Sequence, residues 1–252
     1  MANIIDRTGE VSYNNFGSKI VIKEYRNYDD IDVYFPKYNY TKEHAQYDKF
    51  KKGKVRCPYE PRVFGVGYLG EGRHMSSINR KHTKHYNLWN SMLQRCYDPK
   101  FIEKYPTYTG CKVCPEWHNF QVFSEWVEKN FYEIEGDRMA LDKDILCKGN
   151  KIYSPKNCIF VPNRINSLFV KCDNSRGDLP IGVSYTNKKY RAYYHTDKAT
   201  QHLGCYNTPE EAFQAYKTFK ENYIKGVAEE YKNVIPQKLY EAMLRYEVDI
   251  DD

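Results

Sequence analysis

The spacing of apolar residues changes along the chain, and this change limits the possible folds more than any other feature. Over residues 9–70, apolar residues run together or alternate with polar ones, as in residues 19–23 and 30–35, and Gly, Asn and Pro separate these runs. Such runs predict short strands, so we expect a small N-terminal β module over residues 1–70. From residue 86, apolar residues recur every three or four positions, which predicts helices. We therefore expect a modular α+β protein.

Composition favours several small cores over one large core. Apolar residues make up 41% of the 252 residues, below the usual ~45–50%, while aromatic residues reach 16% and include 25 Tyr. The aromatic share argues against a disordered chain, and the lack of any apolar run of ~20 residues argues against a membrane protein. The net charge of +6 permits a polyanionic partner, although surplus surface lysine explains it equally well.

The cysteines are expected to be reduced thiols. The chain starts without a basic segment followed by an apolar one, so we expect no secretory signal and a cytoplasmic location. The eight Cys would then form no disulfides. Cys111 and Cys114 lack a second pair at zinc-finger spacing, so buried thiols are favoured over a zinc site.

Residues 71–85 carry four Lys or Arg, one Glu and three His without an apolar period. We expect a basic linker that can lie along phosphates, with solvated His side chains. Apolar stripes at helical spacing follow over residues 86–97 and 120–131, and we assign them to the core. Residues 139–169 then predict the order strand, turn, strand, helix.

This last segment stands out together with motifs before it. They include residues 89–97, 110–117, 141–145 and 153–157, followed by Asn166. Together these motifs resemble the HNH, or ββα-metal, endonucleases of phages and mobile introns, which implies a nuclease domain over residues 86–170.

The resemblance also implies site residues. Asp142 matches the strand Asp of that family, Asn157 the Asn that braces the loop, and Asn166 the residue on the helix. It implies one Mg²⁺ or Mn²⁺ bound by Asp142 and Asn166, since carboxylate and amide oxygens are hard ligands. The metal would stabilise charge on the phosphate during hydrolysis.

The chain departs from the family at Lys143, where the family has the His that activates water. Lysine has a pKa of ~10.4 and is a poor base unless it is strongly desolvated. Three alternatives follow. Lys143 stabilises phosphate charge while another group activates water; Asp144 is that group, on the same face of an extended segment as Asp142; or the site is inactive and retained only as a fold.

Residues 178–235 predict three short strands and a long helix. Strand-like runs cover residues 181–185, 190–195 and 200–206, with turns at 187–188 and 197–198. A Thr-Pro-Glu-Glu sequence from Thr208 predicts a capped helix start. These features resemble the AP2-type DNA-binding domain, which implies that the three-stranded sheet lies in the major groove.

Strand alternation predicts which side of this sheet contacts DNA. Arg191, Tyr193 and His195 share one face, and Tyr190, Ala192 and Tyr194 share the other. We expect the helix to cover the second face and DNA to contact the first. The neighbours expected on the DNA side are Lys188, Lys189 and His202. A solvated face without a ligand is the alternative. Residues 236–252 are expected to form a short helix and an acidic tail.

The two resemblances together imply a phage-encoded, homing-like endonuclease that hydrolyses a phosphodiester of double-stranded DNA inside the bacterial host. One metal per chain implies that a monomer nicks DNA and that a double-strand break needs a dimer; the sequence does not define the oligomeric state. The alternative is a DNA-binding protein without catalysis, such as a phage regulator or an inhibitor of host defence. A protein-interaction scaffold is the third possibility.

Overall fold

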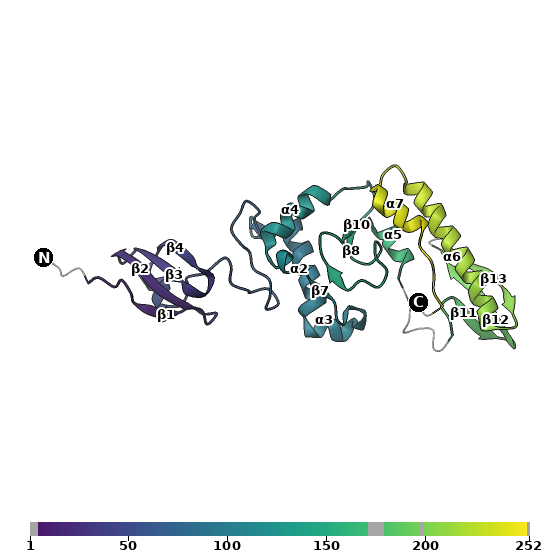
Figure 1. Ribbon diagram of the computed structural model, residues 1–252, viewed down its shortest axis with the longest axis horizontal. Helices are drawn as coiled ribbons and strands as arrows, with labels where there is room; N and C mark the ends of the chain where they lie inside the picture. Colours follow the sequence, from purple (N-terminus) through teal and green to yellow (C-terminus); the bar gives the residue numbers. More distant parts are fainter. Residues whose placement is uncertain (1–4, 171–178, 197–198, 251–252) are drawn as a thin grey trace. The chain divides into compact units, whose positions relative to one another are not determined.

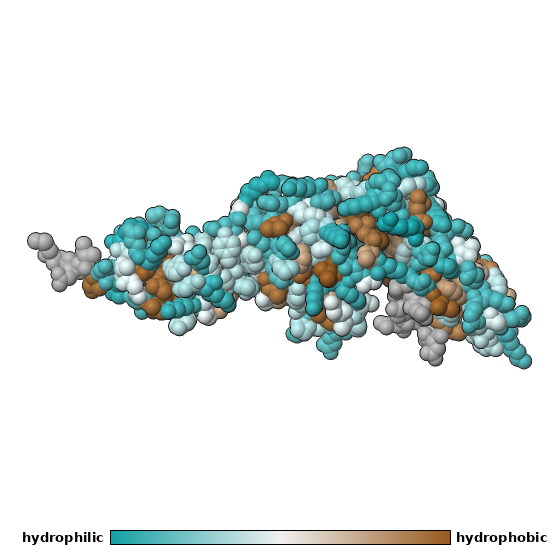
Figure 2. Space-filling model, viewed as in Figure 1, coloured by the Kyte–Doolittle hydropathy of each residue, from teal (hydrophilic) through white to brown (hydrophobic). Residues whose placement is uncertain are grey.

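The structure is a computed structural model that describes residues 5–170, 179–196 and 199–250. The chain divides into two compact units, Met1–Lys129 and Asn130–Asp252. Both contain small sheets and helices, which confirms the predicted α+β class (Figure 1). Hydrophilic residues cover most of the face shown in Figure 2, and hydrophobic residues gather in small areas. No helix among the described residues combines the length and the apolar content needed to cross a membrane.

The first unit begins with an antiparallel four-stranded sheet whose strands lie in chain order (Figure 1). Alternate residues of its third strand point into the core, so Ile31, Val33 and Phe35 are fully buried. The β-rich character predicted for this segment is therefore confirmed. Its elements are β1 (Val11–Tyr13), β2 (Lys19–Asn27), β3 (Asp30–Phe35), η1 (Pro36–Tyr38), β4 (Tyr40–Ala45) and α1 (Tyr47–Lys51).

The rest of the first unit is mainly helical. The predicted apolar stripe after residue 86 is buried in α2 (Lys84–Tyr97), where Trp89 donates a 2.7 Å hydrogen bond to the carbonyl of Trp117. The second predicted stripe forms α4 (Phe120–Asn130). Both stripes are thus core, as expected. The shorter elements are β5 (Ser77–Ile78), β6 (Lys81–His82), α3 (Pro99–Lys104), η2 (Pro106–Tyr108), β7 (Lys112–Val113) and η3 (Pro115–His118).

Residues 71–85 differ from the linker that we expected. They contain the hairpin β5–β6, whose turn residues Asn79 and Arg80 have positive φ. The Gln121 side chain, which is only 7% exposed, bonds to the backbone carbonyls of Leu69 and His74 and accepts from the His74 N–H. The segment is thus ordered by polar contacts, and this explains why it carries no apolar period.

The second unit begins with the predicted order of strand, turn, strand and helix. β8 (Met139–Asp142) pairs antiparallel with β10 (Ile159–Pro162), and Asp142 lies opposite Ile159. The connecting loop contains β9 (Ile152–Tyr153). The helix α5 (Asn163–Leu168) follows at once and packs against β8. Pro162 is the N-cap residue of this helix and makes no side-chain capping hydrogen bond.

A three-stranded antiparallel sheet and a long helix follow. The strands β11 (Val183–Thr186), β12 (Lys189–His195) and β13 (Thr200–Tyr206) lie in chain order. The helix α6 (Pro209–Tyr231) runs along one face of this sheet, and α7 (Gln237–Leu244) follows it (Figure 1). The predicted capping box at Thr208 is present. The turn predicted at residues 187–188 is also found, while that at 197–198 lies outside the described residues.

The long helix α6 contributes to two cores. Ala212, Phe213 and Tyr216 pack against the three-stranded sheet. Further along, Ile224 and Val227 pack in the core that contains β10, α5 and α7. The division of the chain therefore differs from the predicted domains 86–170 and 178–235. A helix of this length spans about 34 Å, more than a small sheet can cover, so its second half is buried elsewhere.

Candidate functional site

Asp142 ends strand β8 and shapes the turn that follows. Its Oδ1 accepts hydrogen bonds from the backbone N–H groups of Asp144, at 2.9 Å, and Ile145, at 2.7 Å. Burial raises the pKa of this carboxyl to about 6, with a further increase from the negative charge of Asp144, and the two backbone hydrogen bonds oppose that rise. At neutral pH Asp142 is mainly ionised, and a cation beside it would relieve the repulsion between the two carboxylates.

Lys143 is buried, with 8% of its surface exposed. Its ammonium lies 3.0 Å from Oδ2 of Asp144 and 5.9 Å from the ring centroid of Tyr153. The geometry therefore places the Lys143 amine beside the site, largely shielded from water and in contact with the Asp144 carboxylate.

The position of Asp144 differs from our expectation. We expected an extended segment in which Asp142 and Asp144 share a face, but β8 ends at Asp142 and the chain turns at the next residues. The two carboxylates are still neighbours, because the turn itself brings them together. The Asp144 side chain is 44% exposed, so it is accessible to water despite its ion pair with Lys143.

Two amide side chains brace the loop between β8 and β10. Asn157 donates to Oδ1 of Asn150 at 2.9 Å, and Asn150 donates to the carbonyls of Lys143, at 2.6 Å, and Ile152, at 2.8 Å. Asn157 thus lies where the resemblance required a bracing residue. Sequence reasoning identified Asn150 only as part of a turn; its place after Gly149 in a long polar loop was the available signal.

Asn166 is half-buried on α5, the helix that packs against β8. Its neighbours Ile165 and Leu168 face the core. A carboxylate from Asp142 and an amide oxygen from Asn166 are the kind of ligands that Mg²⁺ takes, since this ion usually keeps several waters and few protein ligands. The link between these two residues and the expected metal is therefore the chemical type of their donor atoms, on two elements that pack together. No cluster of three or more His, Cys, Asp or Glu surrounds Asp142 within the described ranges.

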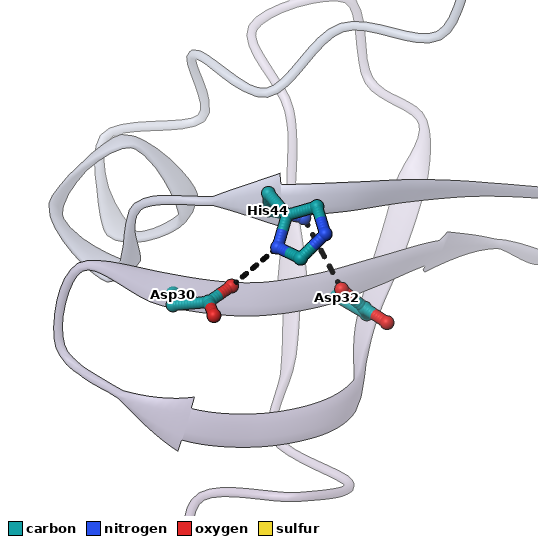
Figure 3. A group of neighbouring side chains, drawn as sticks. All are labelled: Asp30, Asp32 and His44. Carbon is teal, nitrogen blue, oxygen red and sulfur yellow. Dashed lines mark hydrogen bonds and ion pairs between the residues drawn. The ribbon is translucent and has the colours of Figure 1, made fainter.

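The described residues do contain one such cluster, in the first unit. Asp30 and Asp32 on β3 face His44 on β4, and their ligand atoms lie within 4.8 Å of one another (Figure 3). However, the guanidinium of Arg26 bonds both oxygens of Asp30, at 2.8 and 2.9 Å, and also bonds Asp32. This hydrogen bonding is the main reason why the pKa of Asp30 falls to about 2.

Arg26 therefore already supplies the positive charge that these two carboxylates need, and we assign no metal to the cluster. Sequence reasoning missed it. The available signal was the alternation of Asp30 and Asp32 along a strand, which places both on one face.

The three-stranded sheet has the predicted alternation. Ala192 is fully buried and Tyr194 is 7% exposed, both under α6, whereas Arg191 and His195 are exposed and Tyr193 is half-buried. A register shift between Ala192 and Tyr193 interrupts the pairing with β13 but keeps this order.

The exposed face of this sheet is basic and polar. Arg191 donates from Nε to Nδ1 of His202 at 3.2 Å, and Lys189 bonds Asn207. Lys188 is exposed in the turn between β11 and β12, with φ +59°. His195 lies 2.7 Å from Oγ1 of Thr200. The six predicted contact residues therefore lie on or beside one side of the sheet.

Cys205 also lies on this face, although sequence reasoning gave it no role. It is exposed, pairs with Arg191 across the strands, and has its sulfur 3.9 Å from Nε2 of His202. By contrast, Cys111 is buried, and burial raises the pKa of the Cys114 thiol to about 11. The prediction of buried thiols is therefore confirmed for Cys111, whereas Cys114 is partly exposed.

The chain matches no protein family model, no curated protein and no solved structure. The functional argument therefore depends on the residues of this chain.

Proposed function

We propose that this protein is a DNA-binding endonuclease of the HNH type, with an AP2-like sheet as its DNA-binding part. The observation that carries the proposal is the arrangement of β12, where the α6-covered side chains alternate with exposed Arg191 and His195. A flat basic face backed by a helix offers phosphate and base-edge contacts to a duplex.

The cleavage function rests on the unit formed by β8, β10 and α5. In this proposal Asp142 and Asn166 hold one Mg²⁺ or Mn²⁺, which supplies charge stabilisation to the phosphate undergoing hydrolysis. Lys143 adds a fixed positive charge beside it. Asp144 is the accessible carboxylate that takes the proton from the attacking water, and Asn157 holds the loop in place. The substrate is one strand of double-stranded DNA.

One observation favours a second candidate, which is DNA binding without cleavage. Lys143 occupies the position of the expected His base, and its ammonium pairs with Asp144, the carboxylate that would have to take the proton from water. A protein with this site would hold DNA and leave it intact, as a regulator or an inhibitor of host defence would.

Cleavage is tested with supercoiled plasmid in the presence of Mg²⁺ or EDTA. We expect the wild-type chain to convert plasmid to the nicked form with Mg²⁺ only, and Asp142→Ala to abolish this. The control is Asp48→Ala, which removes a surface carboxylate that pairs with Lys52 in the first unit. Nicking that is equal in Asp142→Ala and Asp48→Ala would refute the metal site. Plasmid that stays intact with every protein would leave only the second candidate.

Binding is tested separately by gel shift of a labelled duplex at two salt concentrations. We expect Arg191→Ala to weaken binding, while Lys225→Ala, an exposed lysine of α6, has little effect. The salt slope should fall by about 0.9 for each phosphate contact removed. If wild-type binding shows no salt dependence, both DNA functions are refuted.

A further inference from the structure

The first unit contains a surface pocket that the proposed function does not use. It lies where the turn between β1 and β2 meets η1 and the chain after residue 60, and its volume is about 460 Å³. This volume falls within the ~300–1,000 Å³ typical of pockets that bind small molecules or parts of larger ligands. Its lining includes Tyr13, Phe16, Lys19, Lys37, Tyr38 and Glu60.

Aromatic rings dominate the rim of this pocket. Tyr13 is 63% exposed and Phe16 is 52% exposed, although neither position requires an aromatic residue for the core. The guanidinium of Arg62 lies 4.4 Å from the Phe16 ring centroid, so this ring is supported on one side while much of its surface faces solvent. Tyr38 adds a third, half-buried ring. Such fixed, exposed rings are suited to stacking.

The charge of the lining is positive. Lys19 lies directly opposite Tyr13 in the strand register, and the ammonium of Lys37 lies 5.5 Å from the Tyr38 ring centroid. Both lysines are exposed. Tyr13 and Tyr38 thus each have an exposed lysine beside them that can reach a ligand, whereas Arg62, beside Phe16, is bonded to Glu60 and the Cys57 carbonyl.

The single acid among the lining residues, Glu60, does not oppose this charge. It is 3% exposed, and its carboxylate accepts from Asn14 at 3.0 and 3.1 Å, from Arg62 at 3.0 Å, and from Ser18. These hydrogen bonds occupy both oxygens of the Glu60 carboxylate, and the guanidinium of Arg62 balances its negative charge. The pocket therefore presents aromatic rings and positive charge to a ligand.

We propose that this pocket binds single-stranded nucleic acid, with unpaired bases stacked on both Tyr13 and Phe16 and the adjoining phosphates held by Lys19 and Lys37. Exposed rings alternating with lysines are the usual means of holding a single strand without sequence preference. A duplex does not satisfy the site, because its bases are already stacked on one another. The inference does not depend on cleavage, and it concerns a different surface from the β12 face.

The test uses the full chain and a fluorescein-labelled oligothymidylate, with binding followed by fluorescence anisotropy. We expect Tyr13→Ala and Phe16→Ala each to weaken binding about tenfold, as stacking on one ring is worth roughly 1–3 kcal/mol per base. Tyr13→Phe should keep the affinity, because stacking needs the ring and not the hydroxyl. Lys19→Ala should reduce the salt slope by about 0.7.

Two matched controls separate this site from others. Tyr28 is 53% exposed in the turn between β2 and β3 but does not line the pocket, so Tyr28→Ala should bind like wild type. Lys225→Ala removes an exposed cation of α6 and should also leave oligothymidylate binding unchanged. Equal losses of affinity in Tyr13→Ala and Tyr28→Ala would overturn the proposal, and so would a loss confined to Arg191→Ala. Competition gives a third test: the proposal fails if a proline-rich peptide, as an alternative ligand for aromatic rings, displaces the labelled strand while unlabelled oligothymidylate does not.

Discussion

Replacement of Gly182 by Ala is expected to weaken the packing of the three-stranded sheet against α6 and so to destabilise the second unit. Gly182 has φ +74°, and a Cβ added there would lie 1.9 Å from Cδ2 of Tyr216. Tyr216 is 5% exposed within the core between the sheet and α6, so its ring cannot move aside without loss of packing. Both backbone strain and a steric clash therefore act at this one position.

The magnitude can be worked out from these two effects. A left-handed conformation costs an alanine about 1–2 kcal/mol, and overpacking a filled core costs about 1–3 kcal/mol, so we expect a loss of about 2–5 kcal/mol in the free energy of unfolding. Two other glycines of the second unit serve as references. Gly149 has φ +78° with open space around its Cβ position, so Gly149→Ala should lose only the strain, about 1–2 kcal/mol.

Gly226 lies inside α6 with open space around it, so Gly226→Ala should gain about 0.5–1 kcal/mol from helix propensity. The assay is urea unfolding followed by far-UV circular dichroism. All three Trp lie in the first unit, so tryptophan fluorescence followed in parallel measures how far each substitution affects that unit. If Gly182→Ala is as stable as Gly149→Ala, the close approach to Tyr216 is not a packing constraint and the reasoning fails.

Three further changes test the fold at other positions. Thr208→Ala removes the side-chain bond to the Glu211 N–H at the start of α6 and should cost about 1 kcal/mol in urea unfolding, whereas Thr208→Ser should cost little; equal losses would contradict the cap. Ile224→Ala deletes a fully buried side chain from the core shared by α6 and α7 and should cost about 2–5 kcal/mol in the free energy of unfolding. A loss no larger than that of Lys225→Ala, at an exposed position of the same helix, would refute its burial. Burial lowers the pKa of His118 in the folded chain. Below a pH of about 6.5 the unfolded chain therefore binds a proton that the folded chain resists, so the stability of the first unit should fall as pH decreases from 7.5 toward 5.5. Thermal melts followed by Trp fluorescence measure this fall. His118→Gln should flatten this dependence, and an unchanged slope would remove His118 as its cause.

Much of the fold was predictable because its signals are local. The apolar stripe containing Trp89, the alternation around Ala192 and the capping box at Thr208 each define an element within a few residues, and the structure contains all three. The order of strands and helix around Asp142 was predictable for the same reason.

The remaining features depend on contacts between distant residues. Gln121 orders residues 71–85 through hydrogen bonds that leave no periodic pattern. Arg26 neutralises the carboxylates on β3 only once the strands pair. Ile224 belongs to an apolar face whose period predicts one continuous helix. The sequence alone does not show that the two halves of this helix pack in different cores.

Because α6 packs in two cores, ligand binding at the sheet affects the stability of the other core of the second unit. Tyr223 packs against both cores, so the two cannot melt independently without exposing it. A ligand that stabilises the sheet should then also slow those openings of the other core that expose Tyr223. Hydrogen exchange of α5 and α7, which belong to that other core, should report this effect.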